Sequence, residues 1–258
     1  PPPRSTRNMS AAASDVYKRQ SVDKAYKELI KDSEGKTVVV AVLDTGIDIK
    51  HEDLKGNIWV NKKEIPGNNM DDDKNGFIDD VYGWNFLGDA YYEQLELTRL
   101  LAKGEDFPEK EDAQKDYDKR LAEARGEETL KYYLNYDFKG RTTGDDPDNF
   151  EETYYGDNKV EHSREDESHG THVAGIIAAA RNNNLGMKGV ANNVEIMTLR
   201  VVPYGDEYDK DIALGIIYAA DNGADIINTS FGKGFSPHSD KVRAVSYTHL
   251  TLPTTCSV

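Results

Sequence analysis

Apolar and polar residues alternate along the chain in blocks that predict strands and helices in turn. Residues 37–44, TVVVAVLD, form an unbroken and largely β-branched run, which is typical of a strand buried on both faces. Further strands are predicted at 194–202 and 225–232, and helices before them at 168–182 and 209–224. This alternation over short links predicts an α/β fold, with a mostly parallel sheet flanked by helices.

The rest of the chain is more polar. Residues 21–35 have helical spacing, and residues 51–87 form a loop-rich excursion of Asn, Asp and Gly in which Trp59 and Trp84 are candidate anchors. Residues 88–160 are highly charged. Their middle, 110–134, carries opposite charges three and four residues apart, which predicts a helix. We interpret 88–160 as a charged helical insertion with a solvated surface, and substrate gating or partner binding as its alternative roles.

Both ends of the chain differ in character from the middle. Residues 1–20 are basic and of low complexity, and residues 245–258 follow abruptly after an amphipathic stretch. Both resemble translated sequencing adapters, so we expect them to be non-native, with disordered native termini as the alternative. The expected native part is residues 21–244. On this interpretation the domain continues past residue 244 in the natural protein, and the fold is incomplete at its C-terminus.

Composition narrows the classes of partner. The 258 residues carry a formal net charge of −15, so nucleic acid and anionic membrane surfaces are disfavoured partners, whereas cations and basic peptides are favoured. The sequence contains no run of about 18 apolar residues and therefore predicts no membrane-spanning helix. The single cysteine, Cys256, cannot form an internal disulfide.

The first predicted strand ends in Asp-Thr-Gly, a triplet that occurs in two unrelated classes of peptidase. An aspartic peptidase needs two such triplets, because two carboxylates must share one proton. This chain has one, at Asp44, and its surroundings are βα units. The alternative is that Asp44 orients a histidine. His169 opens a predicted helix, and strand C-termini meet helix N-termini along one edge of an open parallel sheet. We therefore expect Asp44 to bind the His169 imidazole and to fix its tautomer.

Four blocks of sequence then resemble a known family. VAVLDTGID, SHGTHVAGIIAA, GVA at 189–191 and DIINTSFG resemble, in order, the signature blocks of the subtilisin-like serine peptidases. The likeness covers roughly residues 35–244 and implies a subtilisin-like fold. It implies that Asp44 is the orienting acid and His169 the general base of a catalytic triad. His172 is interpreted as a structural residue of the same helix, in preference to a metal ligand.

The same resemblance implies a groove for an extended polypeptide substrate. Ser230, Phe231 and Gly232 would form one wall by pairing their backbone with the peptide, and the segment beginning at Gly205 would face them. The acidic residues next to Gly205, Asp206 and Glu207, would favour basic substrate side chains. We expect a monomer, and an extracellular or periplasmic location as is usual for this family.

Two parts of the catalytic machinery are absent from the sequence. The family nucleophile lies in a Gly-Thr-Ser block that opens a later helix, and no Gly-Thr-Ser occurs here. The Asn that stabilises the oxyanion also lies beyond the strand that ends at Gly232. We therefore expect the parent protein to be a serine endopeptidase and this polypeptide alone to be inactive. The alternative is a non-catalytic, calcium-dependent peptide-binding module.

Residues 68–80, NNMDDDKNGFIDD, predict a structural calcium site. Oxygen side chains recur at alternate positions, and Gly76 can supply a tight turn. The twelfth position is Tyr82, where an EF-hand has a glutamate, so we expect a shorter loop. The candidate ligands in this loop are Asp71, Asp73, Asn75 and Asp79. The family resemblance implies a second candidate, Asp53, which would act with the loop at 181–186.

Overall fold

The structure is a computed structural model that describes residues 21–31, 35–162, 164 and 166–250. The chain divides into two compact units, residues 1–37 and residues 38–258. In the first unit residues 21–30 are helical, as predicted, and the second half of that segment is the π-helix η1, Tyr26–Ile30. The interpretation of residues 1–20 as non-native falls outside the described residues.

The second unit is built on a four-stranded parallel sheet. The strands are β1 (Val38–Asp44), β2 (Gly83–Asn85), β3 (Val194–Arg200) and β4 (Ile226–Thr229), in the order β2-β3-β1-β4. β1 is central and pairs with β3 over its whole length and with β4 over four residues. The predicted α/β class with a parallel sheet is therefore confirmed. The short strand β2 was not predicted, because it lies within a segment whose composition is that of a loop.

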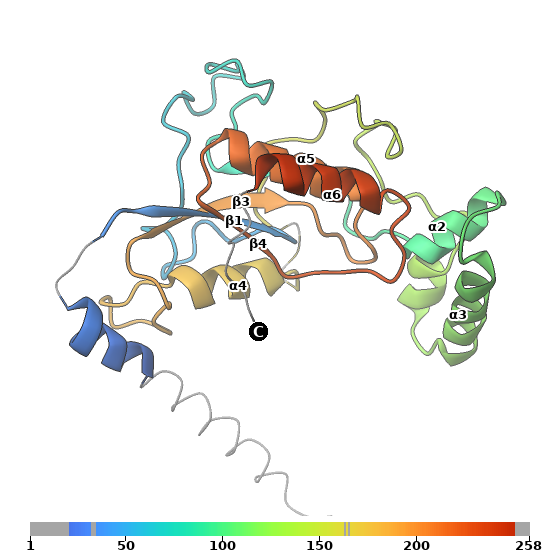
Figure 1. Ribbon diagram of the computed structural model, residues 1–258, viewed down its shortest axis with the longest axis horizontal. Coiled ribbons are helices and arrows are strands. Elements are labelled where there is room, and N and C mark those ends of the chain that lie inside the picture. The colour runs from blue at the N-terminus through green and yellow to red at the C-terminus, as the bar shows by residue number, and fades with distance from the viewer. Residues whose placement is uncertain (1–20, 32–34, 163, 165, 251–258) are drawn as a thin grey trace, which may run out of the picture. The chain divides into compact units, whose positions relative to one another are not determined.

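Helices cover both faces of the sheet (Figure 1). Helix α4 (His169–Ala178) lies on one face, and α5 (Asp209–Asp221) and α6 (Ser239–His249) lie on the other. Small residues on α4, such as Ala174 and Ala178, are fully buried against the apolar side chains of β1 and β3. Both tryptophans are buried as expected, at 8% and 6% exposure for Trp59 and Trp84.

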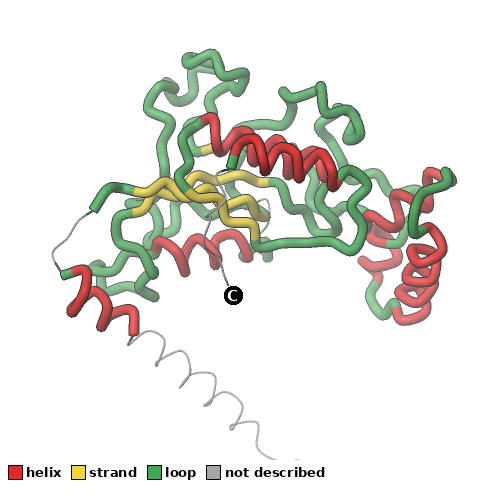
Figure 2. The backbone as a smooth tube through the Cα atoms, in the orientation of Figure 1, coloured by secondary structure: helices red, strands yellow, loops and turns green. Residues whose placement is uncertain are grey.

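The predicted insertion is helical but is not one continuous helix. It contains α2 (Glu96–Lys103), α3 (Lys110–Glu123) and the π-helix η2 (Thr129–Tyr133). The predicted helical stretch at 110–134 is mostly helical, but it is interrupted after Glu123, because Gly126 is a poor helix former. The insertion has a small core of its own, formed by Leu97, Ala113, Tyr117 and Leu134. Its helices lie to one side of the sheet, at the opposite end from the start of β1 (Figures 1 and 2).

Helix α6 crosses the boundary that we placed at residue 244. It is continuous from Ser239 to His249, and Val242 and Val245 both pack against the main core. Residues 251–258, the rest of the predicted non-native tail, lie outside the described residues. Among the described residues, no helix combines the length and the apolar composition needed to cross a bilayer.

Candidate active site

The carboxylate of Asp44 lies at the C-terminal end of the central strand and is almost fully buried, at 1% exposure. Its Oδ1 accepts a hydrogen bond from the backbone N–H of the next residue, Thr45, at 2.8 Å. A buried carboxylate needs such donors, because removing an ionised group from water without partners is costly. The end of β1 thus presents a fixed acceptor at the edge of the sheet.

The partner of this carboxylate is His169, the first residue of α4 and 125 positions further along the chain. His169 Nδ1 lies 2.8 Å from Asp44 Oδ1 and 3.0 Å from Asp44 Oδ2. An ionised carboxylate only accepts hydrogen bonds, so it fixes the proton of a neutral imidazole on Nδ1 and leaves Nε2 with a free lone pair. The side chain of His169 is 56% exposed, which leaves it accessible for proton transfer. The contact expected from the sequence is present.

Close backbone packing holds the imidazole in this position. The N–H of Gly170 donates to Thr45 Oγ1 at 3.3 Å, and Thr171 Oγ1 accepts the N–H of Asp48 at 2.9 Å. A Cβ atom on Gly170 would lie 2.3 Å from the carbonyl oxygen of Gly46 and 3.1 Å from Asp44 Cβ. The glycine therefore allows the first turn of α4 to contact the end of β1 directly. His172, three residues after His169, is exposed and lines a separate cavity with His51 and Ile176.

The two predicted walls of the peptide groove share one cavity of about 570 Å³. Phe231, Gly232 and Glu207 all line it. Apolar side chains of α5, β4 and α6, such as Ile216, Ile227 and Val242, complete the lining. Ser230 is exposed directly after β4. Gly205 does not line the cavity, but it lies two residues before Glu207 on the same segment. The sequence-predicted groove residues are thus neighbours in space, apart from Gly205 itself.

The segment that contains Gly205 is paired on its outer side with the insertion. Tyr204 accepts from the N–H of Glu93 at 2.7 Å and donates its own N–H to Tyr91 at 2.8 Å, and Asp206 donates to Gln94 at 3.3 Å. Gly205 itself is a bend with a φ of +128°, and a Cβ atom there would lie 2.1 Å from the carbonyl oxygen of Glu93. The segment therefore packs directly against the insertion.

Asp206 and Glu207, which we expected to favour basic substrate side chains, each have a defined environment within the fold. Asp206 Oδ2 accepts the backbone N–H of Glu96 at 2.8 Å, the first residue of α2. The Glu207 residue is buried, at 3% exposure. Burial raises the pKa of both carboxyls. The first acid thus stabilises the N-terminus of a helix, and the second lies largely out of contact with solvent.

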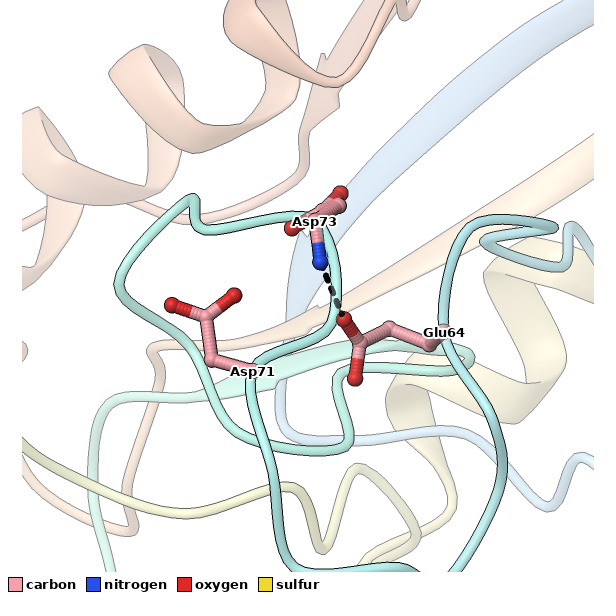
Figure 3. Close-up of side chains that lie close together, drawn as sticks. All are labelled: Glu64, Asp71 and Asp73. Carbon is pink, nitrogen blue, oxygen red and sulfur yellow. Dashed lines mark hydrogen bonds between the residues drawn. The ribbon is translucent and has the colours of Figure 1, made fainter.

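A cluster of three carboxylates is formed by two residues of the Asp-rich loop and one residue before it (Figure 3). Oxygen atoms of Glu64, Asp71 and Asp73 all lie within 4.8 Å of one another. Burial raises the pKa of Glu64, and its Oε1 accepts the backbone N–H groups of Asp72 and Asp73 at 2.9 and 3.2 Å. Carboxylate oxygens gathered this closely repel one another, and they are the donors that a hard divalent cation prefers. The donor set therefore fits a metal ion.

Glu64 is the residue that sequence reasoning missed. It precedes Asp71, the first candidate ligand, by seven positions, so the spacing of an EF-hand does not point to it. The structure brings its carboxylate close to those of Asp71 and Asp73. The sequence does contain one indication of its role, because Glu64 is the acidic residue that precedes the Pro66-Gly67 turn beside the loop.

The other predicted metal ligands have different surroundings. Asp79 accepts backbone N–H groups of residues 67–69 at 2.7–3.2 Å and is not part of the three-carboxylate cluster. Asn75 donates its amide to Asp80 at 2.8 Å and accepts from the N–H of Phe77. Asp53 lies beside the loop predicted as its partner, since its Oδ1 accepts from Asn183 Nδ2 at 2.6 Å. Asp71 and Asp73 remain the two predicted loop residues within the carboxylate cluster.

The fold and this site define a class of protein: a parallel α/β sheet with an aspartate–imidazole pair at the C-terminal edge of its central strand. Comparison with known proteins agrees. The Subtilase family matches residues 35–251 of the chain, and the chain belongs to that family.

Individual relatives are more distant or match over shorter segments. Subtilisin-like protease 1 of Plasmodium berghei (strain Anka) is 28% identical over 212 residues, which cover 80% of this chain and 23% of that protein. The thermophilic serine proteinase of Bacillus sp. (strain AK1) is 52% identical over 66 residues, or 25% of this chain and 16% of that protein. The cell wall-associated protease of Bacillus subtilis (strain 168) is 47% identical over 72 residues, or 28% and 8%. The chain therefore spans less than a quarter of the length of these relatives.

Proposed function

We propose that this chain is part of a serine endopeptidase in which Asp44 and His169 are the acid and the base of the catalytic triad. The observation that carries the proposal is the 2.8 Å contact between Asp44 Oδ1 and His169 Nδ1. This contact joins the end of the central strand to the start of α4, and the base remains accessible. Family membership gives the reaction class, hydrolysis of peptide bonds by acyl transfer.

The geometry assigns each group a step. His169 Nε2 would take the proton of the serine hydroxyl as the serine attacks the peptide carbonyl, and it would return that proton to the leaving amine. Asp44 holds the ring in the tautomer that has its lone pair on Nε2, and it stabilises the imidazolium that forms. Because Asp44 is buried and bonded to Thr45 N–H, it performs this role without moving.

The substrate would be an extended polypeptide. The exposed segment Ser230–Gly232 and the segment Gly205–Glu207 would each pair with its backbone, and the shared apolar cavity would receive a side chain. We also propose that the whole protein acts as a monomer outside the cytoplasm, as the family resemblance suggests.

The 258 residues contain no Gly-Thr-Ser, so we propose that the nucleophile lies on a part of the natural protein outside them. We therefore expect the 258-residue polypeptide to show no peptidase activity alone. The test is a pair of proteins: this chain, and a longer one that adds the native coding sequence after residue 244. We expect a general protein substrate to be cleaved by the longer protein and not by the short one. His169-dependent cleavage by the short chain would contradict the statement about the nucleophile.

We further propose that the cluster of Glu64, Asp71 and Asp73 holds a structural calcium ion. Calcium prefers six to eight oxygen ligands, and the two loop aspartates plus Glu64 supply three from two segments of chain. A bound cation would offset the mutual repulsion of these carboxylates in a strongly acidic chain and fix the long loop to the segment before it. The ion would stabilise the fold and take no part in proton transfer.

The rival function is a calcium-dependent peptide-binding module. The specific observation that favours it is the presence of both the groove cavity and the carboxylate cluster in this chain. If the protein is a binding module, the His169→Ala variant should bind peptides as tightly as the wild type does. The longer protein should then produce no cleaved peptides.

A further inference from the structure

Arg200 and Glu167 form a buried ion pair close to Asp44 and His169, and the proposed catalytic steps do not involve it. Arg200 is 1% exposed and Glu167 is fully buried, and Arg200 Nη2 lies 2.9 Å from Glu167 Oε1. Arg200 ends β3, where its Cα is the register partner of Asp44 on β1. Glu167 lies two residues before His169. The two ends of this ion pair are therefore next to the acid and next to the base.

The guanidinium of Arg200 uses every donor it has. Nε donates to one acceptor, and Nη1 and Nη2 donate to two acceptors each, at 2.9–3.3 Å. These acceptors are the Thr45 carbonyl, Asn85 Oδ1, the Gly88 and Ala90 carbonyls, and Glu167 Oε1. A guanidinium has five N–H groups in a planar fork, so all five are satisfied. One side chain thus joins the end of β3 to three other segments of the chain.

Two of these bonds lead directly to the catalytic pair. Arg200 Nε donates to the carbonyl of Thr45 at 2.9 Å. The backbone N–H of Thr45 donates to Asp44 Oδ1, and the Thr45 hydroxyl accepts from the N–H of Gly170. The bond to Glu167 fixes the chain just before α4 begins. One buried side chain is therefore bonded to Thr45, next to Asp44, and to Glu167, two residues before His169.

We propose that Arg200 is a positioning residue, which holds Asp44 and His169 at hydrogen-bond distance through Thr45 and Glu167. This inference rests on the proposed roles of the pair, but its test needs no substrate. Lysine in place of Arg200 would keep the positive charge, yet it has three donors at one point instead of a planar fork of five. It could not hold Thr45, Glu167 and the insertion backbone together.

The test measures the His169–Asp44 hydrogen bond directly by NMR in the 258-residue chain. The Nδ1 proton of His169 should give a low-field resonance that Asp44→Ala abolishes, which assigns it. In Arg200→Lys we expect this proton to exchange with water at least tenfold faster. The matched control is Arg141→Lys, another largely buried arginine that pairs with Asp145 and Asp211. There we expect less than a twofold change, although stability falls in both variants.

Three results would overturn the proposal. They are an unchanged exchange rate in a folded Arg200→Lys variant, an equal acceleration in the Arg141 control, and the absence of the resonance from the wild-type chain. If Arg200→Lys does not fold, Glu167→Ala takes its place, since it removes the acceptor at Glu167 and leaves the other bonds of Arg200. Unchanged exchange in Glu167→Ala would then contradict the proposal. If the longer protein shows no peptidase activity, the proposed function is refuted, but the NMR result on Arg200 is unaffected.

Discussion

Lys233 Nζ lies 2.7 Å from Glu96 Oε2, and this ion pair joins the segment after the groove wall to helix α2 of the insertion. The lysine also lies 3.0 Å from Asp209 Oδ1 and donates to the Glu207 carbonyl at 2.7 Å. Its side chain is 4% exposed. Although burial acts to raise the pKa of Glu96, Arg99 and Lys233 hold that pKa below its usual value. The insertion is therefore fixed to both walls of the groove by buried charge.

Replacing this lysine should destabilise the chain. Lys233→Met leaves Asp209 and a share of the Glu96 charge buried without a counter-ion, which costs about 3–5 kcal/mol for a buried pair. Lys115→Met removes an exposed pair with Asp112 on α3 and should cost less than about 0.5 kcal/mol. Urea denaturation measures both. Equal losses in the two variants would show that the buried pair does not hold the insertion.

Two glycines in α4 provide a matched test of the close approach to β1. Gly170→Ala places a Cβ 2.3 Å from the Gly46 carbonyl oxygen, so it should cost about 1–3 kcal/mol through strain. It should also displace the imidazole of His169. Gly175→Ala meets no atom within 4 Å and should stabilise the helix by about 0.5–1 kcal/mol. Thermal melting of both variants checks the sign, and two changes of the same sign would contradict this account of the packing.

Calcium should raise the melting temperature of the chain. At a free concentration about 100 times the dissociation constant, binding adds about 2.7 kcal/mol. This corresponds to roughly 5–10 °C for a domain of this size. Asp71→Asn should lose most of this shift, whereas Asp112→Asn, on the exposed face of α3, should retain it. Identical melts with calcium and with chelator would exclude the site.

Stability should depend on pH through Glu93, which is 2% exposed. Burial raises its pKa to about 7, and Arg99 and Arg141 oppose that shift only in part. In this range the folded state binds more protons than the unfolded state, so stability falls as pH rises from about 4.5 to about 7. Glu93→Gln should therefore be more stable than the wild type at pH 8, by about 1–3 kcal/mol. The two should be equal near pH 4.

The control for this prediction is the exposed Glu105. Its replacement by Gln should leave the pH dependence of stability as it is in the wild type. If Glu93→Gln shows the full wild-type decline between pH 4.5 and pH 7, another group is responsible for that decline.

Much of the central sheet and the Asp44–His169 contact could be predicted from the sequence. The β-branched run before Asp44 indicates a buried parallel strand, and the edge rule for such sheets brings its end to the start of the next helix. These features depend on local pattern and on topology, which a single sequence displays.

The unpredicted features depend on long-range packing of polar residues. Glu64 joins the Asp-rich loop only because the chain folds back beside it, and Asp206 is occupied by the N-terminus of α2, 110 residues earlier. Residue composition alone predicts exposed acids in both cases. Strand β2 was also not predicted, because its three residues lie in a segment rich in Asn, Asp and Gly. Only their pairing with β3 makes them a strand.

The measurement that tests the central claim most directly compares the longer protein with its His169→Ala and Asp44→Asn variants in one peptidase assay. The account predicts that the Ala variant loses nearly all kcat, and that the Asn variant loses about four orders of magnitude because the imidazole takes the wrong tautomer. Both variants should retain the melting temperature of the parent to within a few degrees. Cleavage that continues at the parental rate in either variant would contradict the assignment of this pair as the catalytic acid and base.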